Sequence, residues 1–159
     1  MPKYAVKMKA ELENINKLIP IENNLWKFNI KSQDGMDSRE GITVSKGDSL
    51  ELSGSKGEAN FIIKWNSSNP QSYIKIVDSK GVSGMYTADN AGKYVTILVL
   101  ECRGIEPTSC IPGEDFSAET SGGTVFSNID LSDGDWAEYD EENDASVSIT
   151  DVVYIIEKM

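Results

Sequence analysis

The sequence contains no histidine among its 159 residues. Histidine is the side chain most often used for general acid–base chemistry near neutral pH, so its absence excludes Ser-His-Asp and Cys-His catalytic arrangements. The sequence also lacks the GxxxxGK[ST] spacing of a phosphate-binding loop, and no GxGxxG follows a strand to open a helix. Common hydrolase and nucleotide-binding chemistries are therefore unsupported.

Long apolar runs are also absent. No segment approaches the ~20 apolar residues that a membrane helix requires. The first fourteen residues, MPKYAVKMKAELEN, carry charges at every second or third position and have no apolar run of signal-peptide length. We therefore expect a cytoplasmic protein that does not enter a membrane.

Cysteine is scarce, with only Cys102 and Cys110 in the chain. In a cytoplasmic setting these residues are expected to be free thiols rather than a disulfide. Cys102 ends an apolar stretch and is predicted to be buried and inert. Cys110 falls between Pro107 and Pro112, which predict a loop, so we expect it to be the more exposed and oxidisable thiol.

The charge is strongly uneven along the chain. Residues 1–100 hold 13 Lys and Arg against 11 Asp and Glu, whereas residues 101–159 hold 2 against 15. Affinity for nucleic acid comes from Lys and Arg that displace counterions, so nucleic acid and anionic membranes are poor partners for the second half. A basic protein partner, or solubility alone, accounts better for this acidity.

The longest apolar run, YVTILVLEC at Tyr94–Cys102, is rich in β-branched residues and predicts a central strand. Residues 3–13 alternate apolar and charged side chains, which indicates a half-buried strand. Further strands are predicted at LWKFNIK, ITVS, SLELS, FIIKW, YIKIV and GTVFSNIDL. Turns or loops are predicted at residues 14–24, 32–41, 54–60, 66–72 and 78–93.

The C-terminal stretch SVSITDVVYIIEKM is ambiguous, because it fits a strand or strand pair, or a helix that begins at a Thr cap. Short strands at regular spacing, with Gly and Pro turns and little helix, indicate an all-β antiparallel sandwich or barrel. The length of the chain fits a single domain over residues 1–159.

An internal similarity links the two ends of the chain. MKAELENINKLIPIE resembles LVLECRGIEPTSCIPGE, and GDSLELSGSKGEANFII loosely resembles FSNIDLSDGDWAEYDEENDASVSI. These pairs suggest two pseudo-symmetric halves, 3–77 and 94–158, that share one core. Chance similarity between β-rich segments is the alternative.

Carboxylates are dense in residues 130–144, where the spacing does not match a DxDxDG calcium loop. A solvated acidic loop or short helical turn is the simpler interpretation. Within it, Trp136 and Tyr139 are expected to pin the loop to the core. Asp133, Asp135 and Glu138 are the candidate residues of an interaction surface.

Four motifs in combination, KMKAELENI, GEAN, ECRGIEP and GTVFSNIDLSDGDWAEYDEENDASVSI, make the chain similar to the small eukaryotic CXXC-motif-containing zinc-binding proteins. The resemblance covers residues 4–156. It implies a single β-sandwich-like domain, a cytosolic setting and no assigned reaction.

The family takes its name from two CxxC pairs that hold one zinc ion between two loops. The resemblance places the four ligand positions of this chain at Ser32, Gly35, Trp65 and Ser68. Gly35 is placed to within one residue, because its loop is one residue shorter. A closed structural zinc site needs four sulfur or nitrogen donors, and none of these side chains supplies a thiolate. We therefore expect no cofactor and predict that the zinc site is lost, with Trp65 filling the space.

Three functions follow from these observations. The first is a non-catalytic interaction protein, for which a basic protein is the candidate partner. The second is a zinc-binding or redox and metal-homeostasis accessory protein, as the family name suggests. The third is a small-molecule binder or a carboxylate-based enzyme, which needs a concave apolar pocket.

Overall fold

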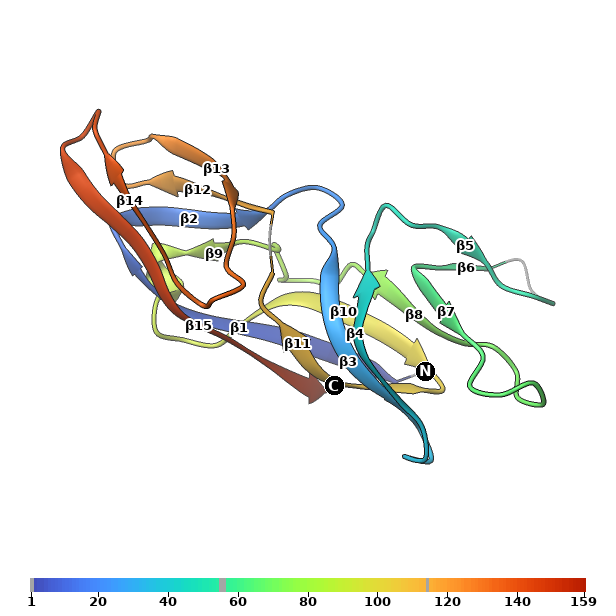
Figure 1. Cartoon of the computed structure of the whole chain (residues 1–159). Helices are drawn as coiled ribbons and strands as arrows, with labels where there is room; N and C mark the ends of the chain where they lie inside the picture. The colour runs from blue at the N-terminus through green and yellow to red at the C-terminus, as the bar shows by residue number, and fades with distance from the viewer. Residues whose placement is uncertain (1, 55–56, 114) are drawn as a thin grey trace.

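The computed structural model describes residues 2–54, 57–113 and 115–159. Within those ranges every element is a β-strand except one 3-10 turn, η1 (Ala88–Asn90) (Figure 1). The prediction of an all-β antiparallel protein with little helix is confirmed. Across the same ranges, the model contains no helix with the length and apolar character needed to span a bilayer.

The largest sheet has six antiparallel strands. Its order is β14 (Trp136–Asp140), β15 (Ala145–Lys158), β1 (Lys3–Glu13), β10 (Val95–Arg103), β8 (Ser72–Val77) and β7 (Phe61–Ile63). The predicted central strand is β10, which lies beside β1 in the middle of this sheet, with Val6 opposite Leu98. Residues Ile97 to Leu100 are all buried, so both faces of β10 are covered.

Two smaller sheets pack against the large one. The first has the order β11 (Ile105–Ile111), β3 (Trp26–Ser32) and β4 (Ser38–Val44). The second has the order β13 (Val125–Ile129), β12 (Phe116–Thr120), β2 (Ile15–Pro20) and β9 (Tyr86–Thr87). A two-stranded ribbon, β5 (Leu50–Glu51) and β6 (Glu58–Ala59), projects from the same side as β7 and β8 (Figure 1).

One apolar core joins the three larger sheets. Period-two alternation places Val6, Met8 and Ala10 of β1 in this core. Phe28 of β3 and Phe116 of β12 meet the core from the two smaller sheets, and both are fully buried. The ring of Phe116 also packs edge-on against the Trp26 ring at 6.1 Å between centroids, which joins the two smaller sheets.

The strand pairing follows the same order in the first and second halves of the chain. Around the central pair β1 and β10, β15 and β14 lie beyond β1, as β8 and β7 lie beyond β10. Each of the two smaller sheets contains strands from both halves of the chain, because β2 pairs with β12 and β11 pairs with β3. The division at 3–77 and 94–158 stays a prediction, since among the described strands β5, β6 and β9 have no counterpart in this order.

The sequence interpretation was wrong or left open at several elements. Residues 15–20, predicted as a turn, form β2, because Asn14 turns the chain in the left-handed region at φ 55° and strand pairing resumes at once. The polar loop predicted at 32–41 is shorter, since β4 begins at Ser38. The acidic segment is not one loop or helical turn, because residues 136–140 form β14 and pair with β15, with turns at 132–133 and 141–144 on either side. The C-terminal stretch is one long strand and not a helix.

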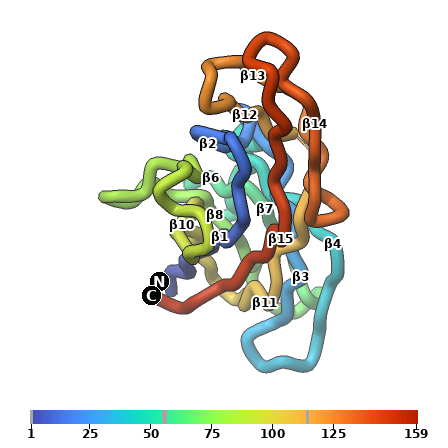
Figure 2. Tube along the Cα trace, turned by 90° about the vertical axis from the view of Figure 1, so that its left-hand side faces the viewer, coloured from blue at the N-terminus to red at the C-terminus, as the bar shows by residue number. Residues whose placement is uncertain are grey.

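The two described ends of the chain lie side by side. Tyr4 of β1 pairs with Lys158 of β15, and the main-chain N–H of Met159 donates to the carbonyl oxygen of Lys3 at 2.8 Å. Figure 2 shows the two ends together at one end of the β1–β15 pair. The first and last strands of the protein therefore form one continuous antiparallel pair next to the centre of the largest sheet.

Candidate functional site

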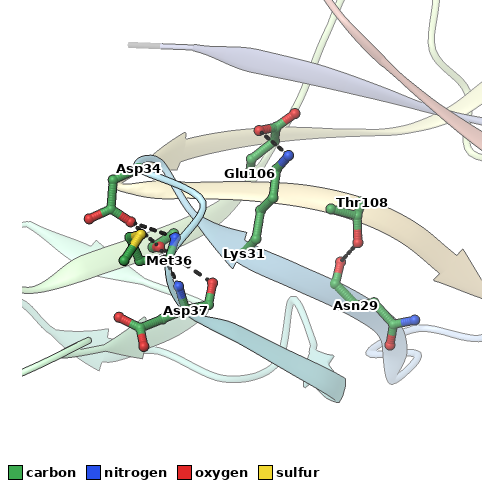
Figure 3. A network of polar contacts seen from close by, with 8 residues as sticks. Asn29, Lys31, Asp34, Met36, Asp37, Glu106 and Thr108 are labelled. Atoms are coloured by element: carbon green, nitrogen blue, oxygen red, sulfur yellow. Dashed lines mark hydrogen bonds and ion pairs between the residues drawn. The ribbon is translucent and has the colours of Figure 1, made fainter.

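The loop between β3 and β4 is closed by its own hydrogen bonds. Ser32 ends β3 and is buried, and its hydroxyl donates to Asp34 Oδ1 at 2.6 Å. The N–H of Asp37 donates to the Ser32 hydroxyl at 3.1 Å, and the N–H of Gly35 donates to the Ser32 carbonyl at 2.9 Å. Figure 3 shows Asp34, Met36 and Asp37 gathered in this loop. The hydroxyl of Ser32 is thus occupied inside the loop.

The same hydrogen bonds set the ionisation of Asp34. The Ser32 hydroxyl, and then the N–H of Met36, donate to this carboxylate and lower the pKa of Asp34 below its usual value. Gly35 lies at φ +75°, a left-handed conformation that glycine adopts without strain. The loop is a compact turn that needs no added ligand to satisfy these groups.

Strand β11 pairs with β3 on the side opposite to β4. Lys31 and Glu106 form an ion pair of 3.4 Å across β3 and β11. The Thr108 hydroxyl donates to the Asn29 carbonyl oxygen at 3.0 Å (Figure 3). These contacts fix β3, and with it the position of Ser32, relative to β11.

The second loop lies between β7 and β8 and contains Trp65 and Ser68. The Ser68 N–H and hydroxyl both donate to Asn66 Oδ1, at 3.0 and 2.7 Å, so Ser68 is bonded within its own loop. Trp65 reaches further: its Nε1–H donates to the Gly104 carbonyl oxygen at 2.9 Å. The Arg39 guanidinium of β4 lies 5.7 Å from the centroid of the Trp65 ring. Of the four positions that the resemblance assigns to zinc ligands, Trp65 is the one whose side chain contacts Gly104 and Arg39, which lie outside its own loop.

The chemistry of these four positions does not suit zinc. Ser32 and Ser68 offer neutral hydroxyls, Gly35 has no side chain, and the Trp65 indole is a hydrogen-bond donor only. Among the residues that the structure describes, no group of three or more His, Cys, Asp or Glu side chains is arranged to hold a metal ion. The residues present do not fit the metal that the family name implies.

The two cysteines lie away from these loops, and both are buried free thiols. Cys102 is in β10, and burial, followed by the nearby Glu101 charge, raises its pKa to about 12. Cys110 lies in β11, and burial raises its pKa to about 12 as well. The prediction of an exposed Cys110 in a loop was wrong, because Pro107 sits at a register shift that lets β11 pair with β3 without its N–H.

A polar cluster joins the corresponding loops of the second half, between β12 and β13 and between β14 and β15. The hydroxyls of Thr120 and Thr124 donate to the two oxygens of buried Asp140 at 2.8 and 2.9 Å. The Asn143 amide donates to Asp140 Oδ2 at 2.8 Å. Sequence reasoning missed this cluster, because no local pattern brings Thr120 and Asp140 together.

The hydrogen bonds decide the ionisation of Asp140. Burial raises its pKa, but the bonds from Asn143, Thr120 and Thr124 outweigh that effect. The net pKa of Asp140 is therefore below its usual value. In the second half of the chain, the Asp140 carboxylate joins the described β12–β13 and β14–β15 loops. In the first half, the Trp65 side chain contacts Gly104 and Arg39.

The three candidate interaction residues lie in and beside β14. Asp133 and Glu138 are exposed, whereas exposed Asp135 also accepts a hydrogen bond from the Asp151 N–H at 3.1 Å. Trp136 packs edge-on against the Phe126 ring at 5.4 Å, as the pinning hypothesis requires. Tyr139 does not pin this segment, since its side chain is 47% exposed.

These features define a small all-β protein in which the four positions that the resemblance assigns to zinc ligands carry no thiolate and no imidazole. The model of the family described as "CXXC motif containing zinc binding protein, eukaryotic" matches residues 5–157. The chain belongs to this family.

Individual relatives agree with this assignment over nearly their whole length. The chain is 36% identical to the "CXXC motif containing zinc binding protein" of Rattus norvegicus over 157 residues, which is 97% of each chain. It is similar to the solved structure titled "Hypothetical protein from plasmodium falciparum", with a TM-score of 0.93 and 34% identity over 99% of this chain and 100% of that one. It also matches "Crystal Structure of C1orf123", with a TM-score of 0.89 and 34% identity over 99% of both chains.

Proposed function

We propose that this protein is a non-catalytic interaction protein, and that it is a family member that has lost the zinc site. The observation that carries the proposal is the identity and bonding of the four ligand positions. Ser32 and Ser68 bond within their own loops, Gly35 turns the chain, and Trp65 bonds to Gly104. A closed zinc site needs four sulfur or nitrogen donors, which these residues do not supply.

Two further features support binding over catalysis. The sequence has no histidine for acid–base chemistry. Both cysteines are buried with raised pKa values, and a thiol rather than a thiolate is a poor nucleophile and a poor metal ligand. Neither feature supports a redox or metal-carrying role.

The acidity of residues 101–159 supports a basic partner. Asp133 and Glu138 stand exposed at β14, which is an edge strand of the large sheet. Clustered surface carboxylates attract a positively charged protein and speed its association at low salt.

Metal analysis of untagged protein tests the first part of the proposal. Protein purified without chelators is expected to contain much less than one equivalent of zinc per chain. One equivalent that survives dialysis would contradict the loss of the site. The matched control is the rat relative, prepared in the same way.

A pull-down tests the second part. We expect a stoichiometric partner that is lost when Asp133→Asn, Asp135→Asn and Glu138→Gln are combined. The matched control is the triple variant Glu22→Gln, Asp37→Asn and Glu51→Gln, which removes the same charge from the first half. If both triple variants lose the partner equally, net charge rather than this surface determines binding.

A further inference from the structure

A cavity of about 520 Å³ opens beside the connection between β2 and β3, far along the chain from the acidic segment. Its walls come from that connection, from the segment Ser83–Met85, and from β8 and β10. Ligand pockets in proteins have volumes of roughly 300–1,000 Å³, so a small molecule fits this space.

The floor of the cavity is apolar. Trp26, Ile97 and Leu98 line it, and each is at least nine-tenths buried. Ile76 and Met85 form half-buried walls at its sides. An apolar ligand gains free energy when it leaves water for such a surface.

The wall at Met85 is held in place by strand pairing. β9 begins at the next residue, and Tyr86 pairs with Leu18 of β2. The Tyr86 hydroxyl is buried and donates to the Asn90 carbonyl oxygen at 2.6 Å. The cavity is therefore preformed on this side, which reduces the entropy that a ligand must overcome.

One polar side chain of the cavity lacks a partner. Asn24 lines the cavity and is 5% exposed, and its Oδ1 atom has no hydrogen-bond partner among the described residues. The backbone of Asn24 is fixed, because its N–H donates to the Ile21 carbonyl oxygen at 3.2 Å. The amide itself can rotate about its last side-chain bond, which is a soft torsion. Because Oδ1 itself is buried, a ligand N–H or O–H would reach it after the amide turns toward the cavity, and would then supply the missing hydrogen bond.

The mouth of the cavity carries both signs of charge. Lys46 lines it and forms an ion pair of 3.2 Å with Asp78, and Glu22 also lines it. Because the Lys46 ammonium already faces a carboxylate, the mouth does not favour an anionic ligand. Glu22 is exposed and remains solvated, and a ligand without net charge avoids placing an unpaired charge on the apolar floor.

We infer that this cavity binds a neutral, largely apolar small molecule that carries one N–H or O–H group, and that this group donates to Asn24. The buried floor supplies affinity by removing apolar surface from water. The Asn24 amide orients the ligand and selects against hydrocarbons without a donor, since they leave the amide unpaired.

N-phenyl-1-naphthylamine is a suitable probe, because it is neutral, apolar and has a single N–H donor. A fluorescence titration of the full chain is expected to saturate at one site. Met85→Trp fills the cavity and should abolish this saturation. The matched control is Met36→Trp, at an 81% exposed position in the β3–β4 loop, which should bind the probe as the wild type does.

Asn24→Leu tests the polar contact separately. This substitution removes the unpaired Oδ1 atom, so we expect a higher Tm. The affinity for the probe should fall about tenfold, which corresponds to the loss of one hydrogen bond to a buried group. Circular dichroism checks that both variants are folded; if Met85→Trp does not fold, Ile76→Trp replaces it. Binding that does not saturate, or that persists unchanged in a folded cavity-filling variant, would overturn the inference.

Discussion

The indole Nε1–H of Trp65 donates a hydrogen bond of 2.9 Å to the main-chain carbonyl oxygen of Gly104. Gly104 lies between β10 and β11, and β11 pairs with β3. This bond therefore ties the end of β7 to the sheet that carries the β3–β4 hairpin.

Trp65→Ala is expected to destabilise the protein by about 2 kcal/mol, below the range for fully buried aromatic residues because Trp65 is half-buried. Trp65→Phe keeps most of the ring but loses the hydrogen bond, so it should cost about 1 kcal/mol. Urea unfolding of the two variants measures both values. Equal stability of Trp65→Ala and the wild type would show that this connection contributes nothing.

Gly104→Ala should be more harmful than an ordinary glycine substitution. Gly104 has φ +72°, and an added Cβ would lie 2.2 Å from the Ser72 hydroxyl oxygen and 3.0 Å from the Ser72 Cβ. We expect a loss of at least about 2 kcal/mol, from left-handed strain plus overlap. The matched control is Gly41→Ala, at φ +66° with nothing within 4 Å of the added Cβ. If both variants lose equal stability in urea, the contact with Ser72 is not the cause.

The Asp140 cluster makes stability depend on pH. Because the pKa of Asp140 is lower in the folded protein than in the unfolded chain, folding favours its ionised form. This contribution is fully present above the unfolded value of about 4 and is lost as the pH falls through the folded pKa. We therefore expect the wild type to exceed Asp140→Asn in Tm at pH 7 and this difference to shrink below about pH 4.

Thermal unfolding of both proteins between pH 7 and pH 3 measures this difference. Asp133→Asn, an exposed position in the preceding turn, is the control and should track the wild type. A Tm difference between the wild type and Asp140→Asn that stays constant over this range would contradict the role of the ionised carboxylate.

Thiol reactivity should be very low in the native state. Cys102 is fully buried and Cys110 is 7% exposed, and burial raises both pKa values to about 12. Titration with Ellman's reagent at pH 8 is expected to find much less than one reactive thiol in the native protein. The same titration in guanidinium should find two. Rapid reaction of a whole thiol in the native protein would show that one of these strands opens readily.

The sequence predicts the strands whose burial pattern is long and regular, whereas the short strand β2 was predicted as a turn although Ile15 and Leu18 are buried. β1 and β10 were recognised because alternation or a continuous apolar run marks burial on one or both faces. β14 was missed, because Ala137, Glu138 and Tyr139 are all exposed at a sheet edge. β11 was missed because Pro107 normally argues against a strand, and only a register shift in its pairing accommodates it.

The candidate site was predictable only in part. The family ligand positions follow from motif resemblance, whereas the bond from Trp65 to Gly104 was not predicted. That Trp65 fills the space of a lost zinc site stays a prediction. The contacts of Asp140 and the unpaired amide of Asn24 depend on strands that are distant in sequence. Local patterns carry no information about such contacts, so the sequence could not reveal them.

The pairing of β1 with β15 has a consequence for chain order. The N–H of Met159 lies 2.8 Å from the Lys3 carbonyl oxygen, so a short linker would join the two ends without disturbing a strand. A circularised chain reopened in the exposed segment 66–69 would keep the same set of strand pairs. The architecture is therefore defined by which strands are neighbours, and the order in which they follow one another along the chain is incidental to it.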